Sequence, residues 1–446
     1  MDNHSDIVII GGGPAAMITA LTARRYYPEK SITMIKNKAA DIIPCGIPYM
    51  FHSLEHPAQN AMSSDGLSKN NIAVVIDEAK KIDRETHQVT TAQDEVYPYE
   101  KLVLAIGSVP IIPPIGGIDL EGIYPIEKDL EYIQDMVKNV KEAENVLIVG
   151  GGFIGVELAD EITSLADVRV HLVEMLPHLL AHSFDTEYAQ MVEEKLESRG
   201  VQIYTNTGVQ EFSSDGNGKT AHLADGTDIP IDYAILGIGA RPNTDLAEQA
   251  GLSLFDGSGI WVDEYMRTTD PDIFAVGDCA VKRDFFTREK APVMLASTAT
   301  AEARIAGANL YKLKVVRENK GTIAIYSTYV DGLVLGSAGL TEHTATAKGF
   351  EVKVGTAHCV DKHPGVLPDT HQCQVKLIFS RNSEIIMGGQ VAGGSSACEM
   401  INTIGGAIQQ RTSRSEFETM QMATHPFITA APTQYPLVIA AQNANS

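Results

Sequence analysis

Two copies of one pattern constrain the fold of this chain more than any other feature. In each copy, a short apolar β-run leads into a glycine-rich turn, followed by a helical stretch and a second β-run. Residues 11–16 read Gly-Gly-Gly-Pro-Ala-Ala, and residues 150–155 read Gly-Gly-Gly-Phe-Ile-Gly. A strand, a glycine turn, a helix and a second strand make up a dinucleotide-binding βαβ unit. The sequence therefore predicts two nucleotide sites.

The glycines in these turns have distinct purposes. The first permits a tight turn, the second lets the backbone approach a pyrophosphate, and the third lets the helix pack on its strand. The N-terminus of the helix then faces the phosphates. In the first turn Ala16 takes the place of the third glycine. The residues that we expect to contact cofactor are Gly11, Gly13, Pro14 and Ala15 in the first turn, and Gly150, Gly152, Phe153, Ile154 and Gly155 in the second.

The two copies differ at the end of the second β-run. The second copy ends at Glu174, where a carboxylate accepts hydrogen bonds from the adenosine ribose hydroxyls and disfavours a 2′-phosphate. This predicts a preference for NADH over NADPH, although a solvated carboxylate at a strand end would also explain Glu174. The first copy ends at Lys36, so the equivalent acid is missing.

Charge and cysteine content narrow the classes of function. Lys plus Arg number 35 and Asp plus Glu number 57, which gives a net charge of −22. So acidic a surface should repel nucleic acid and anionic lipid, and we expect neither as a partner. Five cysteines with no CxxC pair and no zinc spacing predict neither a disulfide scaffold nor a metal site. No signal peptide or bilayer-spanning run is visible, so we expect a cytoplasmic protein.

The order of these motifs resembles that of the FAD-dependent pyridine nucleotide-disulfide oxidoreductases, over essentially the whole chain. The first glycine turn is similar to the family's FAD turn and the second to its NADH turn. Gly277-Asp278 resembles the second FAD motif, whose aspartate binds the ribityl chain. The resemblance also places Lys36, Pro44, Ala105, Gly107 and Gly239 among the cofactor-binding residues.

The resemblance implies an α/β fold with two Rossmann-like domains, for FAD and NADH, and a C-terminal α+β dimerisation domain. We expect residues 1–112 and 241–322 to form the FAD domain in two parts. Residues 113–240 should form the NADH domain, and residues 323–446 the interface domain of a homodimer.

The branch of the family depends on Cys45, within Ile-Pro-Cys-Gly-Ile-Pro-Tyr at residues 43–49. Two-cysteine members carry CxxxxC here, whereas this chain is similar to the single-cysteine branch. That branch contains coenzyme A-disulfide reductases, NADH oxidases and peroxidases, and persulfide or polysulfide reductases. A thiol at a helix N-terminus beside a flavin should be an activated nucleophile, so Cys45 is the predicted redox centre. In the mechanism that the resemblance implies, Phe153 covers the nicotinamide pocket and Glu157 is the acidic neighbour of the nicotinamide.

Three departures from the family pattern bear on the reaction. Pro14 stands where oxidase and peroxidase members carry a histidine, which argues against the hypothesis of an NADH oxidase or peroxidase. Lys36 replaces the acid that binds the FAD ribose. His425 lies in a His-Pro motif like that of the two-cysteine members, but Ala430 stands where their orienting glutamate would be. His425 suits protonation of a leaving thiolate, and a structural histidine explains it about as well.

A coenzyme A-linked substrate would involve Arg24 and Arg25, where coenzyme A-disulfide reductases place arginines for phosphates. A cationic helix end favoured by the helix dipole explains both arginines equally well. Tyr435, in the tail, is a further candidate for substrate contact. The hypothesis is an FAD-containing, NADH-dependent reductase of a small disulfide, persulfide or polysulfide. The alternatives are an NADH oxidase and a reductase of a rubredoxin-like or ferredoxin-like partner.

Overall fold

The computed structural model describes residues 4–216 and 218–445. Its residues divide into two compact units. The first unit extends to residue 112 and also contains residues 125–139 and 239–322; the second contains 113–124, 140–238 and the described residues from 323 onward. The NADH and interface segments fall in one unit, so the division into three domains stays a prediction.

The sheet of the first unit has the strand order β3-β2-β1-β6-β5-β4, with β17 beside β6. Its parallel strands are β1 (Ser5–Ile10), β2 (Ile32–Lys36), β3 (Ala73–Ile76), β6 (Val96–Leu104) and β17 (Ile273–Ala275). The antiparallel strands are β4 (Ala79–Asp83) and β5 (Gln88–Thr91). Most of β1 is buried, as expected for a parallel strand that is covered on both faces.

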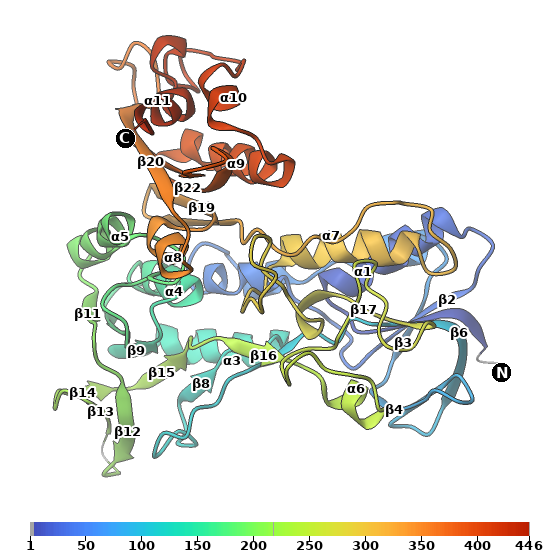
Figure 1. The fold of residues 1–446 in the computed structure, drawn as a ribbon. Helices are drawn as coiled ribbons and strands as arrows, with labels where there is room; N and C mark the ends of the chain where they lie inside the picture. Colours follow the sequence, from blue (N-terminus) through green and yellow to red (C-terminus); the bar gives the residue numbers. More distant parts are fainter. Residues whose placement is uncertain (1–3, 217, 446) are drawn as a thin grey trace. The chain divides into compact units, whose positions relative to one another are not determined.

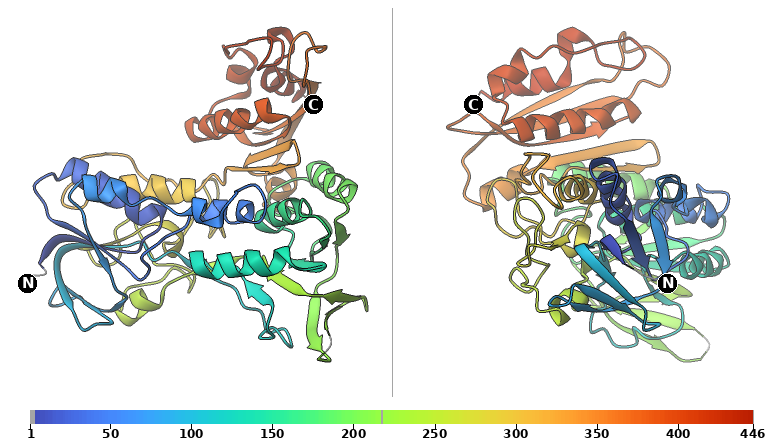
Figure 2. Two further views of the ribbon diagram at one scale, coloured as in Figure 1. Left: turned by 180° about the vertical axis from the view of Figure 1, so that it is seen from behind. Right: turned by 90° about the vertical axis from the view of Figure 1, so that its right-hand side faces the viewer.

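Helices α1 (Pro14–Tyr26) and α7 (Ala296–Ala308) run side by side in this unit (Figures 1 and 2). A Cβ on Gly307 would lie 2.9 Å from the carbonyl oxygen of Thr19, so this close approach requires glycine. The shorter elements are η1 (Pro44–Gly46), η2 (Pro48–Met50), η3 (Pro57–Asn60), α2 (Asp65–Lys69), β7 (Ser108–Pro110), β16 (Ala240–Pro242), α6 (Asp245–Gln249) and η4 (Gly277–Cys279).

The second unit contains a five-stranded sheet in the order β11-β10-β9-β15-β8 and a three-stranded antiparallel sheet. The strands of the first are β8 (Ile123–Pro125), β9 (Asn145–Val149), β10 (Arg169–Val173), β11 (Gln202–Tyr204) and β15 (Tyr233–Leu236). The helices are α4 (Phe153–Ile162) and α5 (Thr186–Ser198), whereas most of α3 (Leu130–Lys141) belongs to residues 125–139 of the first unit. The second sheet consists of β12 (Val209–Ser214), β13 (Lys219–Leu223) and β14 (Asp228–Ile231).

The C-terminal part of the second unit is an antiparallel sheet in the order β18-β19-β22-β21-β20. Its strands are β18 (Tyr326–Val330), β19 (Leu333–Gly339), β20 (Val352–Val360), β21 (Gln372–Ser380) and β22 (Ile386–Gly393). The helices are α8 (Glu342–Ala347), α9 (Cys398–Gln410), α10 (Arg414–Glu418) and α11 (Pro436–Asn443), and η5 (Ser395–Ala397) and η6 (Pro432–Gln434) are short turns.

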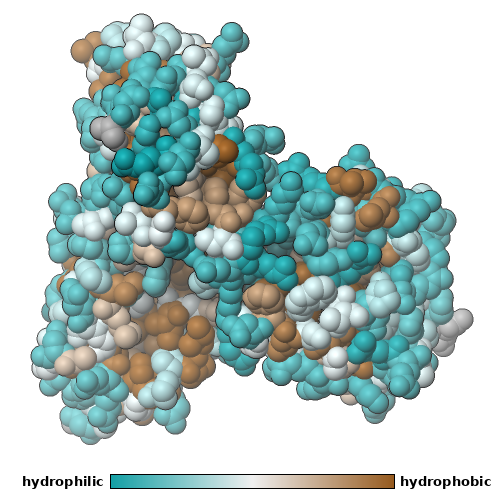
Figure 3. Space-filling view, viewed as in Figure 1, coloured by the Kyte–Doolittle hydropathy of each residue, from teal (hydrophilic) through white to brown (hydrophobic). Residues whose placement is uncertain are grey.

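The face drawn in Figure 3 is mostly hydrophilic, with smaller hydrophobic areas between. None of the helices in the described part of the chain combines the length and the apolar character that a membrane crossing needs.

Candidate active site

The first glycine turn joins β1 to α1 and is open where a phosphate would sit. Gly11 has φ +128°, and a Cβ on it would lie 2.2 Å from the carbonyl oxygen of Ala105. A Cβ on Gly13 would meet no atom within 4 Å, and no side chain caps α1 at this residue. The space beside Gly13 at the start of α1 is therefore open, as a pyrophosphate bound at a helix N-terminus requires. Pro14, at the first helical position, has no N–H to leave unpaired.

The second FAD motif meets this turn in space. A Cβ on Gly277 would lie 2.9 Å from Cβ of Ala15, so η4 packs against the start of α1. Asp278 Oδ2 accepts hydrogen bonds from Ser108 Oγ at 2.9 Å and Lys128 Nζ at 3.2 Å. The structure thus brings together two motifs that are far apart in the sequence, both of which the sequence predicts to contact FAD.

A buried ion pair fixes the backbone of η4. Lys282 Nζ lies 3.0 Å from Glu302 Oε2 and donates to the carbonyl oxygen of Gly277 at 2.6 Å, while Glu302 accepts from the N–H of Gly277 at 2.9 Å. Burial raises the pKa of Glu302, and Lys282 opposes that rise. Both side chains therefore hold the turn that presents Asp278.

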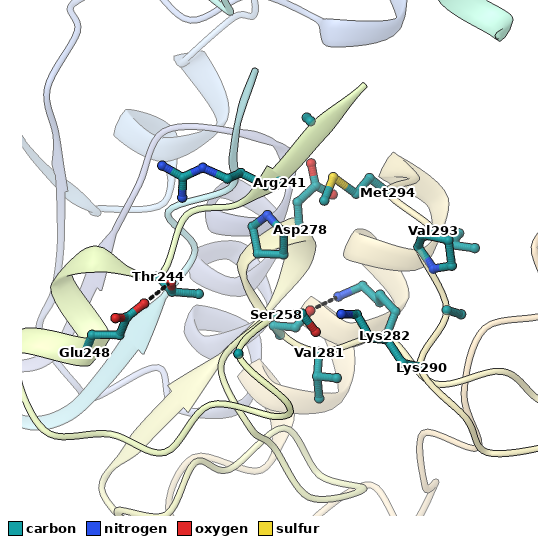
Figure 4. Close-up of a pocket in the computed structure, with 16 residues that line it drawn as sticks. Arg241, Thr244, Glu248, Ser258, Asp278, Val281, Lys282, Lys290, Val293 and Met294 are labelled. Atoms are coloured by element: carbon teal, nitrogen blue, oxygen red, sulfur yellow. Dashed lines mark hydrogen bonds between the residues drawn. The ribbon is translucent and has the colours of Figure 1, made fainter. Parts of the chain in front are cut away.

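A cavity of about 330 Å³ opens beside Asp278 (Figure 4). Its wall includes Arg241, Lys282, Lys290 and Met294. Asp278 and Glu248 also line the cavity and Lys282 is paired with Glu302, so the wall suits a polar ligand of mixed charge. Sequence motifs did not single out these residues, because each becomes part of the site only through the fold.

The first nucleotide-binding unit lacks an acid at the end of β2, but the carboxylate of Asp41 lies nearby and is paired with Lys36. The Lys36 side chain is 6% exposed, and its Nζ lies 2.5 Å from Asp41 Oδ2. A Cβ on Gly12 would lie 2.4 Å from Asp41 Oδ1, so this carboxylate lies directly against the glycine turn. Asp41 thus supplies a carboxylate where β2 itself ends in a lysine. No sequence motif indicated this role, since Asp41 lies in a loop after β2.

Cys45 lies in the 3₁₀ turn η1 and is exposed. The predicted helix after it is replaced by two short turns, each with a proline in its first positions. Proline lacks the N–H that a continuous helix would need. Asn60 holds the turn by donating to the carbonyl oxygen of Ile43 at 3.0 Å. Cys45 lies four positions after Asp41 in the chain, so its Cα is within about 14 Å of that of Asp41.

The second glycine turn joins β9 to α4 in the second unit. A Cβ on Gly150 would lie 2.7 Å from the carbonyl oxygen of Gly237, and one on Gly155 would lie 1.9 Å from the carbonyl oxygen of Gly150. Gly152 faces open space at the uncapped start of α4. Glu174 accepts from the N–H groups of Gly151 and Leu176, both at 2.7 Å. The predicted NADH turn therefore has the same open helix start as the FAD turn.

Phe153 and Glu157 project from α4 toward the C-terminal part of the same unit. The ring of Phe153 stacks on Tyr326 with centroids 4.9 Å apart and also contacts Phe184. Glu157 is 9% exposed and accepts a hydrogen bond from Thr328 Oγ1 at 2.8 Å. Burial raises the pKa of Glu157 to about 7, with Asp160 and Glu161 adding to the rise and Thr328 opposing it.

The other predicted site residues lie in separate parts of the fold. His425 is exposed, and its Nδ1 accepts from the N–H of Phe427 at 3.3 Å, which leaves Nε2 as the protonated nitrogen of the neutral ring. Tyr435 is half-buried at the start of α11, where burial raises its pKa. Pro44 begins η1, Gly107 precedes β7, and Gly239 precedes β16.

Arg24 has a structural role that differs from the predicted substrate contact. Its guanidinium donates to four backbone carbonyl oxygens, those of Pro28, Lys30, Asn70 and Asn71. Binding a phosphate would break these bonds, so Arg24 is a poor candidate for a coenzyme A contact. Arg25 is exposed and lies over the ring of Tyr26.

Comparison with known proteins extends these observations. Residues 5–303 match the family described as pyridine nucleotide-disulphide oxidoreductase, and residues 325–435 match the dimerisation domain of that family. An NADH oxidase of Enterococcus faecalis is 29% identical, over 91% of this chain and 92% of that protein. An NAD(P)H coenzyme A polysulfide/persulfide reductase of Pyrococcus horikoshii is 27% identical, over 98% and 97%. The structure of an NAD-dependent persulfide reductase from A. fulgidus has a TM-score of 0.90 at 29% identity, over 98% of this chain and 82% of that chain.

Proposed function

The chain belongs to the pyridine nucleotide-disulphide oxidoreductase family, and we propose that it reduces a small disulfide, persulfide or polysulfide with NADH through Cys45. Membership of the family confirms the predicted α/β fold, the enzyme class, and the use of FAD and NAD(P)H. Our proposal further includes the acceptor, the preference for NADH, the homodimer and the roles of single residues.

The observation that carries the proposal is the position of Cys45. Its thiol is exposed on the turn η1, four positions after Asp41 in the chain. Asp41 lies against the first glycine turn, where the pyrophosphate of a dinucleotide fits. An exposed thiol within reach of a flavin is suited to two-electron sulfur chemistry. Bound FAD supplies the two-electron carrier between NADH and this chemistry.

The reaction at Cys45 is a thiol–disulfide exchange. The thiolate attacks one sulfur of the acceptor, the acceptor's S–S bond breaks, and the leaving thiolate takes a proton. Cys45 is then in a mixed disulfide, and two electrons from NADH with a proton release the second thiol and restore the thiolate. The net change oxidises one NADH and reduces one S–S bond.

Further side chains have roles in the proposal. Asp41, held by Lys36, and Asp278 anchor the ribose and ribityl hydroxyls of FAD. Phe153 covers the nicotinamide pocket, Glu157 lies beside the nicotinamide, and Glu174 binds the adenosine ribose. In a homodimer formed through the dimerisation domain, His425 protonates the leaving thiolate at the partner's site.

An NADH oxidase is the second candidate, because the E. faecalis relative carries that name. Pro14 disfavours it, since proline offers no proton or hydrogen bond for oxygen chemistry. Anaerobic NADH oxidation with coenzyme A persulfide, polysulfide and small disulfides, beside oxygen uptake in air, separates the two candidates.

Replacement of Cys45 is the decisive variant in that experiment. Cys45→Ser should lower turnover with every sulfur acceptor by at least about a hundredfold and still bind FAD, because only the nucleophile is lost. Cys398→Ser is the matched control, as it removes another thiol outside the proposed site. Full turnover of Cys45→Ser would contradict the thiol mechanism. Rapid oxygen uptake would favour the oxidase, and turnover only with a rubredoxin or ferredoxin would favour an electron-transfer role.

A further inference from the structure

Two cysteines outside the proposed site lie opposite each other on adjacent strands of the C-terminal sheet. Cys359 on β20 and Cys373 on β21 are direct partners in the antiparallel register. Cα atoms of directly opposed residues lie about 4.5 or 5.5 Å apart, depending on the hydrogen-bonding position. Both values fall within the range of about 4.4 to 6.8 Å that a disulfide bond tolerates. The backbone therefore permits a bond between these sulfurs.

The register of the two strands is fixed next to this pair. Asp361 directly follows β20, and its carboxylate accepts from the N–H of His371 at 2.8 Å and from Ser396 Oγ at 2.8 Å. His371 is the residue just before β21. The bond from His371 ties the end of β20 to the start of β21, so the thiols are held opposite one another.

The two thiols differ in accessibility and acidity. Cys359 is half-buried on the edge strand β20, whereas Cys373 is 2% exposed on the next strand inward. The thiol of Cys373 donates a hydrogen bond to Cys359, which lowers the pKa of Cys359 against the opposing effects of burial and Asp361. That same contact and burial raise the pKa of Cys373. A more acidic, more accessible thiol beside a buried one is the arrangement of an attacking and a resolving cysteine.

We propose that Cys359 and Cys373 form a second redox-active dithiol, which closes to a cross-strand disulfide by exchange with a small soluble disulfide. The Cys359 thiolate attacks one sulfur of the small disulfide, forms a mixed disulfide and releases one thiol. Cys373 then attacks the Cys359 sulfur and releases the second thiol. The two hydrogens lost by the protein thiols end on the two released thiols. The pair thereby responds to the thiol–disulfide ratio of its surroundings, independently of Cys45.

The test uses the FAD-loaded protein with Cys45→Ser and Cys398→Ser, so that the pair and the fully buried Cys279 are the remaining thiols. After incubation with bis(2-hydroxyethyl) disulfide, the intact protein should lose the mass of two hydrogen atoms. Trypsin should then release a disulfide-linked pair of peptides, residues 354–362 and 363–376.

Two added substitutions distinguish the roles of the thiols. With Cys373→Ser, or Cys373→Ala if the serine variant does not fold, a mixed disulfide should persist on Cys359. With Cys359→Ser, the buried Cys373 should stay unmodified. The proposal is overturned if the intact pair stays reduced, or if a mixed disulfide accumulates on Cys359 while Cys373 is present.

Discussion

The hydroxyl of Thr328 donates a hydrogen bond of 2.8 Å to the carboxylate of Glu157, across a sequence separation of 171 residues. Glu157 lies on α4 next to the second glycine turn, and Thr328 lies on β18 of the antiparallel sheet. The bond favours the charged carboxylate, whereas burial favours the neutral acid, and the balance sets a pKa of about 7. The C-terminal sheet thus tunes an acid of the predicted NADH site.

Thr328→Val should shift the pH dependence of NADH use upward. Loss of the donated bond destabilises the charged form of Glu157, so its pKa rises above about 7. The midpoint of kcat/KM for NADH against pH, which reports the free enzyme, should move to higher pH by roughly one unit. Ser327→Ala is the control, because Ser327 is exposed on the same strand. An identical midpoint in Thr328→Val and the wild type would remove Glu157 from the NADH step.

Asp41→Asn should weaken the binding of FAD to the apoprotein at least about tenfold, because a charge-assisted hydrogen bond to the ribose is lost. FMN lacks the adenosine, so its affinity should not change. Titration of the apoprotein with each flavin, followed by fluorescence, measures both values. Asp65→Asn is the control, since the Asp65 side chain is 77% exposed in the same unit. Equal losses for FAD and FMN would place Asp41 away from the adenosine end.

Glu174→Gln should reduce the discrimination between NADH and NADPH. The carboxylate is held by two backbone N–H groups at the end of β10, and its negative charge disfavours a 2′-phosphate. The ratio of kcat/KM for NADH to that for NADPH should fall about tenfold or more. Glu144→Gln, at a side chain that is 78% exposed, is the control. A wild-type preference for NADPH would refute the role given to Glu174.

The proposed role of His425 requires two subunits. Homodimers of Cys45→Ser and of His425→Gln should both turn over slowly. In a mixed dimer, one of the two sites combines an intact Cys45 with an intact His425. The mixed dimer should therefore recover up to about half of the activity of a wild-type dimer. Activity after co-expression of the two variants measures this recovery. If mixed dimers gain nothing, His425 does not act across the interface.

Features that depend on the conformation of the backbone could be predicted from the sequence. Gly11 and Gly150 need glycine because neighbouring carbonyl oxygens fill the space of a Cβ, and this requirement leaves a visible motif. Side chains that meet only through folding leave no motif. Asp41 beside Gly12 and Thr328 beside Glu157 belong to that class, as does the pairing of Lys282 with Glu302.

Arg24 shows the converse limit of sequence patterns. Its place at the end of α1 suited a phosphate contact, but the fold brings four carbonyl oxygens to its guanidinium. The environment of a cationic side chain, rather than its place on a helix, decides what it binds.

The central claim is that Cys45 carries sulfur-acceptor chemistry. The direct measurement is an anaerobic NADH titration of FAD-loaded protein that has been incubated with a small disulfide and then desalted. Wild-type protein should consume about one equivalent of NADH per FAD more than Cys45→Ser, because the mixed disulfide on Cys45 takes up two further electrons. Equal consumption by the two proteins would contradict the account.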